Sequence, residues 1–246
     1  GSLLSMVDKI DTLVGFFIIG KKPTGSKDPF ALRRSGFSIV QILINLKLNI
    51  SLNAVIVTSL EEYVCSSESI KLSLIDFMID KLRFVLSSQN NRIDIINSVL
   101  NTEIINDLPI KLICSRIDSL NKFNEDNNFK IFLANFKRIN NILKSIKFSN
   151  YIEVQVNTRL FETTEEKNIY NQINSFSLEI NERGDCEKSQ DILIKSLINM
   201  NKSISLFFDN VIVDHHDYRI KYNRLSLLRN LHNLMLKFSS FDLIED

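Results

Sequence analysis

Residues 15–34 read GFFIIGKKPTGSKDPFALRR, an apolar run that leads into a basic turn. Five residues after Gly20, the letters GSK at 25–27 stand where a phosphate-binding loop would place its glycine, lysine and hydroxyl. Such a loop needs Gly-Lys-Ser/Thr in that order, and here the hydroxyl residue precedes the lysine. Asp28 follows at once, where a phosphate would meet the helix N-terminus. The stretch therefore predicts a basic turn between two helices, and not a nucleotide-binding loop.

The turn carries five cations within fourteen residues: Lys21, Lys22, Lys27, Arg33 and Arg34. The two arginines fall in the first turns of the following helix, where the helix dipole disfavours positive charge unless an anion compensates it. One interpretation is a solvated turn in which the arginines pair with Asp8, Asp11 or Asp28. The other is that the cations contact the phosphates of a bound RNA. Composition alone favours the first.

Composition favours a helical protein without a strong overall charge. The 246 residues are 44% hydrophobic, enough for a buried core, and contain only six Gly and three Pro, which disfavours β-sandwiches and glycine-dependent nucleotide folds. Thirty Lys and Arg nearly cancel 29 Asp and Glu, so a nucleic-acid site must be a local patch. Cys65, Cys114 and Cys186 have no paired spacing, which predicts neither disulfides nor zinc and favours the reduced cytoplasm. No apolar run approaches the ~18 to 20 residues that span a bilayer, so we expect no membrane partner.

Apolar residues recur at helical spacing along the chain, and no run alternates as a strand would. The sequence therefore predicts an all-α fold. The run at 204–219, ISLFFDNVIVDHHDYR, is interpreted as an apolar stretch broken by a turn, with Phe207, Phe208 and Phe238 in the core. Asp28 and Pro29 form a helix start. The expected helices are 3–19, 29–46, 52–65, 70–86, 92–100, 109–123, 129–147, 165–181, 189–200 and 220–238.

Three blocks resemble one known family. The block at 8–36, DKIDTLVGFFIIGKKPTGSKDPFALRRSG, resembles the signature of the β subunit of the bacterial heterotetrameric glycyl-tRNA synthetase. FKRINNIL at 136–143 resembles a basic helix of that family, and LFFDNVIVDHHDYRIKYNRLSLLRNL at 206–231 resembles its C-terminal segment. The resemblance covers nearly the whole chain but only about the C-terminal third of a family β subunit, so we expect a C-terminal fragment.

The resemblance implies two functional domains. Residues 1–66 would be the tail of an HD-type helical domain that carries the basic turn, and residues 67–246 a helical linker followed by a helical-bundle anticodon-binding domain like that of arginyl-tRNA synthetase. The fragment would bind tRNA-Gly at its anticodon region, while the α subunit carries out ATP-dependent glycylation. It would thus be a non-catalytic part of a cytoplasmic ligase, a heterotetramer with two α and two β subunits. ATP and Mg²⁺ would act at the α subunit, and we expect no cofactor here.

Seven further residues are candidates for tRNA contacts: Lys137, Arg138, Asn141, Arg219, Asn223, Arg224 and Arg229. The first three combine cations and an amide on one helix, which can contact phosphates and the edges of unpaired bases. An ordinary polar helix face fits their spacing equally well. Arg224 continues an apolar stripe, so it must pair or reach outward. A salt bridge to Asp209 or Asp214 is favoured over RNA contact for Arg224, and the neighbouring Arg219, Asn223 and Arg229 are the better RNA candidates.

Two other functions remain open from the residues alone. The chain could be a helical scaffold for subunit assembly, without direct anticodon contact. It could also be a metal phosphohydrolase, since the resemblance places Asp8 where HD-type domains keep their final metal-binding Asp. However, the histidine pair His215 and His216 follows Asp8 instead of preceding it, and the only other histidine is His232. We therefore predict no metal site and no catalytic residue.

Overall fold

The computed structural model describes residues 1–24, 27–63, 67–102, 105–145, 155–184 and 186–245. Within these residues the chain forms helices and no strand, which confirms the predicted all-α fold. It divides into two compact units, Gly1–Asp118 and Ser119–Asp246. Among the described residues, no helix combines the length and apolar character that crossing a bilayer requires.

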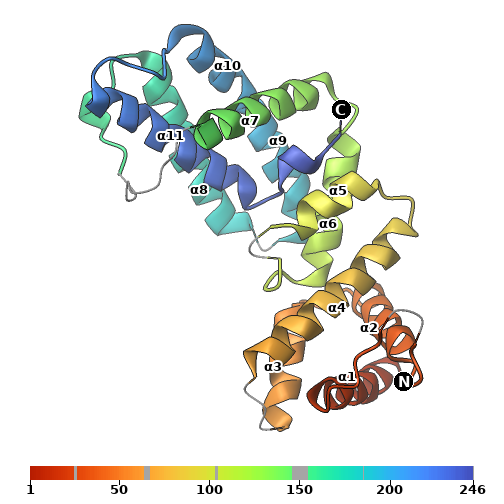
Figure 1. The fold of residues 1–246 in the computed structure, drawn as a ribbon. Helices are drawn as coiled ribbons and strands as arrows, with labels where there is room; N and C mark the ends of the chain where they lie inside the picture. The colour runs from red at the N-terminus through yellow and green to blue at the C-terminus, as the bar shows by residue number, and fades with distance from the viewer. Residues whose placement is uncertain (25–26, 64–66, 103–104, 146–154, 185, 246) are drawn as a thin grey trace. The chain divides into compact units, whose positions relative to one another are not determined.

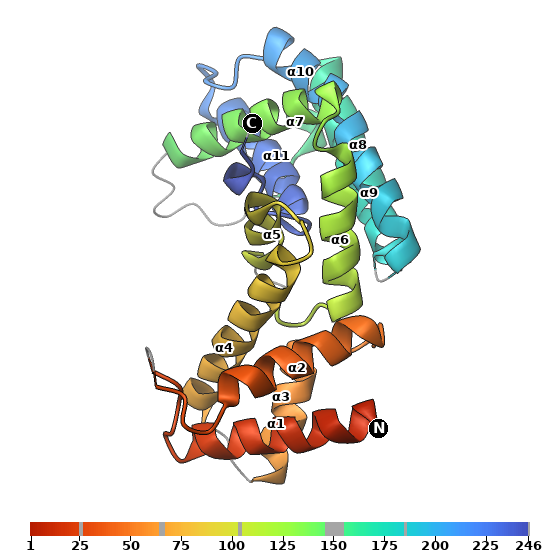
Figure 2. The ribbon, with the colours of Figure 1, turned by 90° about the vertical axis from the view of Figure 1, so that its right-hand side faces the viewer.

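The first unit is built from helices alone among its described residues. They are α1 (Ser2–Ile18), α2 (Leu32–Asn45), α3 (Leu52–Glu62), α4 (Glu68–Ser87), α5 (Ile93–Leu100) and the greater part of α6 (Ile110–Phe123). Helix α1 packs against α2 and α3, and α4 packs against α2, α3 and α5 (Figure 1 and Figure 2). Gly36 lets α2 approach α4, because a Cβ there would lie 2.8 Å from the ring of Phe77.

Helix α2 begins at Leu32, later than the predicted start at Pro29, and the reason lies in the turn before it. The Asp28 carboxylate reaches forward and accepts the backbone N–H groups of Leu32 at 2.8 Å and Arg33 at 3.1 Å. Ala31, the residue just before α2, has a φ of 55° and turns the chain into the helix. Asp28 thus caps the helix as predicted, although it lies four residues before the first residue of α2. Its carboxylate occupies the donors that a phosphate would need, and this supports rejecting the nucleotide loop, although the GS pair at 25–26 lies outside the described residues.

Replacing Asp28 with Ala should lower the free energy of unfolding by about 1 kcal/mol, because two backbone donors at the start of α2 lose their acceptor. Urea unfolding followed by helical circular dichroism measures the change. Asp28→Asn is the matched control, since its amide oxygen can still accept one of the two bonds. Equal stability of the Ala variant and the wild type would show that this cap contributes nothing.

The second unit surrounds an aromatic core. Its elements are the end of α6, α7 (Asn127–Ser145), η1 (Thr158–Leu160), α8 (Thr164–Arg183), η2 (Glu187–Ser189), α9 (Gln190–Asn199), α10 (Asn201–Asn210), α11 (Tyr218–Leu236) and η3 (Phe241–Leu243). Helix α8 packs against α10 and α11, and α7 packs against α9, α10 and α11 (Figure 1). The ring of Phe241 lies edge-on to Phe132 and Phe136, at centroid distances of 5.0 and 5.4 Å.

Most predicted helices are present, with shifts of a few residues at their ends, and one helix was missed. Helix α10 occupies the first half of the run that was interpreted as a broken apolar stretch. The prediction that Phe207, Phe208 and Phe238 belong to the core is confirmed, since all three are buried.

The compact units divide at 118 and 119, within α6, whereas the sequence placed a functional boundary at 66 and 67. Helix α4 follows that expected boundary, yet it packs against α2 and α3 and so belongs to the first compact unit. The assignment of 1–66 and 67–246 to separate functional domains stays a prediction.

Candidate nucleic-acid interface

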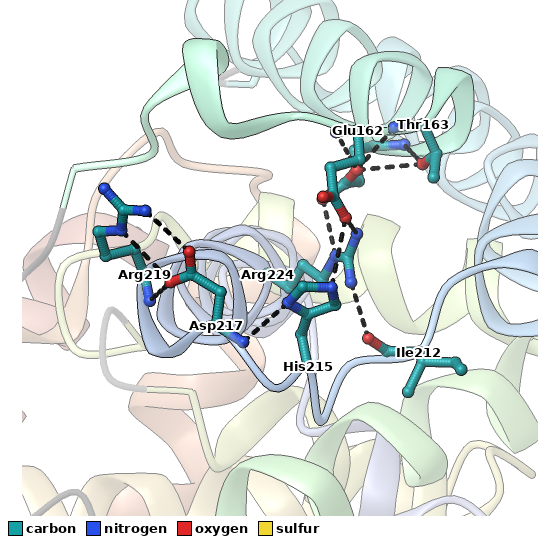
Figure 3. Close-up of polar contacts among 8 residues, drawn as sticks. Glu162, Thr163, Ile212, His215, Asp217, Arg219 and Arg224 are labelled. Carbon is teal, nitrogen blue, oxygen red and sulfur yellow. Dashed lines mark hydrogen bonds and ion pairs between the residues drawn. The ribbon is translucent and has the colours of Figure 1, made fainter.

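The loop before α11 is held by a buried arginine, Arg224, whose side chain is 3% exposed. Its guanidinium donates to three acceptors: Glu166 Oε1 at 2.9 Å, Glu162 Oε2 at 2.8 Å and the carbonyl oxygen of Ile212 at 2.9 Å (Figure 3). The prediction that Arg224 pairs with Asp209 or Asp214 was wrong. The carboxylates of Glu162 and Glu166 come instead from the segment that opens α8. Arg224 therefore joins α8, α11 and the loop between α10 and α11.

Glu166 is fully buried and serves two structures at once. One carboxylate oxygen pairs with Arg224, and the other accepts the backbone N–H groups of Glu162 and Thr163 at 2.8 and 2.9 Å, completing the capping box of α8. Burial alone would raise the pKa of Glu166, but the hydrogen bonds from Arg224 and from the two backbone donors outweigh it and lower the pKa below 4.5. The carboxylate is therefore ionised, and the pair is a fixed internal brace.

Asp217 caps α11 at the surface end of the same brace. Its carboxylate accepts the Arg219 backbone N–H at 2.8 Å and the Arg219 guanidinium at 2.8 Å (Figure 3). These hydrogen bonds and the charge of Arg219 lower the pKa of Asp217 to about 2. The Arg219 side chain is nevertheless 78% exposed, so its cation is held at the helix start and stays accessible.

Asn223, which the sequence offered as a better candidate for RNA contact than Arg224, is only 2% exposed. Its side-chain oxygen accepts the backbone N–H of Asn157 at 2.7 Å, and its amide donates to the carbonyl oxygen of Asn157 at 3.1 Å. These paired bonds fix the segment before η1 against α11. Asn223 and Arg224 therefore have internal structural roles, and their buried side chains are unsuited to contact RNA.

Helix α11 carries four cations, Arg219, Lys221, Arg224 and Arg229, and no acidic residue. Arg229 is half-buried. Burial lowers the pKa of His232, and although Asp242 opposes the shift, the charges of Lys144 on α7 and Arg229 on α11 add to it. Lys144, which was not among the sequence candidates, and Arg229 therefore both act on the charge of His232.

The α7 candidates differ in their surroundings. Arg138 is exposed, and its guanidinium carbon lies 4.1 Å from the centroid of the Phe208 ring, a cation–π contact that holds the side chain flat against α10. Asn141 is exposed and Lys137 is half-buried. Because α7 packs against α11, these three belong to the same unit as Arg219 and Arg229. Their contact with RNA stays a prediction.

The basic turn of the first unit presents four exposed cations, Lys21, Lys22, Lys27 and Arg34. Of these, Lys22 also donates to Ser73 Oγ at 2.6 Å and lies 5.6 Å from the centroid of the Phe17 ring, so it braces the turn against α4. Arg33 is half-buried and gives its backbone N–H to Asp28.

The acids near this turn have specific roles. Asp28 stabilises it through backbone hydrogen bonds, and Asp11 accepts a hydrogen bond from the Tyr63 hydroxyl at 2.8 Å. Pairing of the arginine side chains with Asp8, Asp11 or Asp28 stays a prediction, because the bonds that Asp28 makes here are to the backbone N–H groups of Leu32 and Arg33. Contact of the turn with RNA phosphates stays a prediction.

Among the described residues, no three His, Cys, Asp or Glu side chains form a group that could hold a metal ion. The rings of His215 and His216 lie 4.1 Å apart, but His215 accepts the Asp217 backbone N–H and faces Glu162 at 3.6 Å. His215 is thus part of the brace around Arg224 (Figure 3). Cys114 and Cys186 are unbridged, and Cys65 lies outside the described residues.

Comparison with known proteins gives two family matches along the chain. Residues 1–101 match the family model for the glycyl-tRNA synthetase beta subunit. Residues 132–239 match the DALR anticodon binding domain. The second match begins in α7 and ends just after α11, so it contains the Arg224 brace and all the candidate residues of the second unit.

Individual relatives carry the same description. The chain is 35% identical over 244 residues to the glycine–tRNA ligase beta subunit of Buchnera aphidicola subsp. Schizaphis graminum, covering 98% of this chain and 34% of that protein. It is 35% identical over 241 residues to that of Rickettsia bellii, with 98% and 34% covered, and 31% identical over 235 residues to that of Thermodesulfovibrio yellowstonii, with 96% and 33% covered. The chain therefore spans about a third of the length of the curated relatives that it matches.

Proposed function

The chain belongs to the glycyl-tRNA synthetase beta-subunit family, and from this premise we propose that residues 119–246 bind the anticodon region of tRNA-Gly. The observation that carries the proposal is helix α11, which contains four cations and no acidic residue and begins with the exposed Arg219, inside the match to an anticodon-binding domain. The overall charge of the chain is close to neutral, so this local concentration of cations matters.

Binding would proceed in two steps that use different side chains. The exposed cations Arg219 and Arg138 attract the phosphates of the RNA backbone, and each contact releases bound counterions. The amide of Asn141 and the guanidinium groups then contact the edges of unpaired loop bases, the part of RNA that can be read by sequence. The Arg224 brace keeps the start of α11 in place before the RNA arrives, so little ordering cost is added on binding.

In the whole enzyme, the chain would supply tRNA binding and no catalytic group. Glycine activation with ATP and Mg²⁺ would take place on an α subunit, in a cytoplasmic heterotetramer of two α and two β subunits. This assignment rests on the family, since the relatives that the chain matches are beta subunits of glycine–tRNA ligases. The basic turn of the first unit would add phosphate contacts through Lys21, Lys27 and Arg34, with Lys22 and Arg33 supporting the turn.

Titration of labelled tRNA-Gly against the full-length β subunit tests the function. We expect affinity to fall steeply with salt, by roughly 0.7–0.9 in log K per unit of log salt for each phosphate contact. Glycine anticodons share a CC pair, and replacing one of these bases should weaken binding by about 1–3 kcal/mol if the loop is read directly. An unrelated tRNA of equal length is the control. Equal affinity for both tRNAs at physiological salt would contradict anticodon reading.

A further inference from the structure

Tyr218 is the first residue of α11 and projects into solvent from a capped helix start. Tyr218 is 71% exposed, although tyrosine carries a large apolar ring. A single exposed aromatic residue is common on protein surfaces and by itself indicates nothing. What distinguishes Tyr218 is its surroundings, which combine a second tyrosine, accessible cations and a fixed backbone.

The spacing along α11 places Tyr218 on one face with other groups suited to RNA. Tyr222 lies one turn further, and Arg229 and Asn233 continue the same side of the helix, since residues about 3.6 apart fall on one face. Tyr222 and Arg229 are half-buried, and Asn233 is exposed. Leu225, on the same side between Tyr222 and Arg229, is fully buried. The accessible part of this side is therefore Tyr218 with part of Tyr222 at the helix start, and part of Arg229 with Asn233 further along, without a carboxylate on the helix. Aromatic rings interleaved with cations are the usual surface for single-stranded RNA.

The backbone that carries Tyr218 is held from three directions. Asp217 caps the helix, Arg224 donates to the carbonyl oxygen of Ile212, and Lys221 pairs with Asp214 at 2.5 Å. The hydrogen bond to Asp214 also raises the pKa of Lys221. The loop and the first turn of α11 are thus fixed to each other. The backbone that carries the Tyr218 ring therefore needs no reordering when the ring stacks on a base.

We propose that Tyr218 stacks on an unpaired base of the bound RNA, with Tyr222 extending the aromatic surface by about 6 Å along the helix. The proposal rests on the proposed function, because it names the aromatic part of the same RNA-binding face. It assigns the ligand class: a single-stranded loop whose bases are splayed out, as opposed to a duplex, in which the base faces are covered. Arg219, beside Tyr218, then meets the adjoining phosphate.

The test uses the full-length β subunit and an RNA hairpin that copies the anticodon stem and loop of tRNA-Gly. Tyr218→Ala should weaken binding about tenfold, the scale of losing one stacked base. Tyr218→Phe should bind like the wild type, because the ring is kept. The slope of log K against log salt should be unchanged in both variants, since no charge is removed. Leu178→Ala, at a residue that is 63% exposed on α8, is the matched control and should have no effect.

A second set of hairpins, each with one abasic loop position, locates the base. One abasic position should weaken wild-type binding about tenfold and should have no further effect in Tyr218→Ala, because both changes remove the same contact. Tyr218→Ala binding within twofold of wild type, or Tyr218→Phe losing as much as Ala, would overturn the stacking site alone. Failure of the wild type to bind tRNA-Gly or the hairpin would overturn the proposed function and the stacking site together.

Discussion

Replacing Arg224 with Met should lower the free energy of unfolding of residues 119–246 by about 3–5 kcal/mol. The variant leaves the Glu166 carboxylate fully buried without its cation, and it releases the carbonyl oxygen of Ile212. Methionine has a similar length, so loss of packing contributes little compared with the unpaired charge. Urea unfolding followed by tyrosine fluorescence measures the effect, because the chain has no Trp and Tyr63 is the only one of its five Tyr in the first unit.

Two controls separate the buried pair from a general effect of removing an arginine. Arg219→Met removes an exposed guanidinium from the same helix and should change stability little, because water and salt screen its pair with Asp217. Combining Arg224→Met with Glu166→Gln should recover part of the loss, since no unpaired charge then stays buried. An Arg224→Met variant as stable as Arg219→Met would show that the brace does not support the unit.

The same pair gives the unit a predictable response to acid. The pKa of Glu166 is lower in the folded chain than its ordinary value of 4.5, so folding favours the ionised carboxylate. The stability that results is present above pH 4.5 and is lost as the pH falls through the lowered folded pKa. In Arg224→Met the cation that lowers this pKa is gone, so the loss of stability on acidification should be smaller than in the wild type.

Helix positions could be predicted because the apolar spacing persists through almost every helix. Helix α10 could not, and its contacts explain why. Its inner face includes Asn201 and Ser205, which bond to the side chain of Asn135 on α7 at 2.5 and 2.9 Å. Polar residues at core positions interrupt the periodicity. In addition, Met200 alone separates α9 from α10, without a Gly or Pro to mark the break.

The site was harder to predict than the fold, because its contacts are distant in sequence. The position of Arg224 on an apolar stripe correctly required a partner, but the partner chosen from nearby acids was wrong. Glu166 and Glu162 lie 58 and 62 residues before it. The internal role of Asn223 was missed for the same reason, since its partner Asn157 is 66 residues away. Arg219 and Arg138, both candidates for RNA contact from the sequence, are exposed in the structure.

Reversing the charge of Lys137, Arg138 and Arg219 to Glu should weaken tRNA-Gly binding by about two orders of magnitude near 0.1 M salt. Each lost phosphate contact removes its share of counterion release, and each new carboxylate repels the RNA backbone. The salt slope should therefore also become shallower, by roughly 0.7–0.9 per contact removed. Filter binding or fluorescence anisotropy over a salt series gives both numbers. Unfolding measurements must accompany them, because Arg138 also contacts the Phe208 ring.

The matched control reverses three exposed cations on other elements of the same unit: Lys167, Lys188 and Lys195. It changes the net charge by the same amount, so a general field effect would weaken tRNA binding equally in both variants. We expect the control to keep nearly all of its affinity, and both variants to associate normally with an α subunit in sedimentation experiments. If the first variant keeps its tRNA affinity, the cations of α7 and α11 do not bind RNA. If the charge-reversed variant of α7 and α11 loses its association with the α subunit instead, these helices serve subunit assembly, and the chain is a helical scaffold.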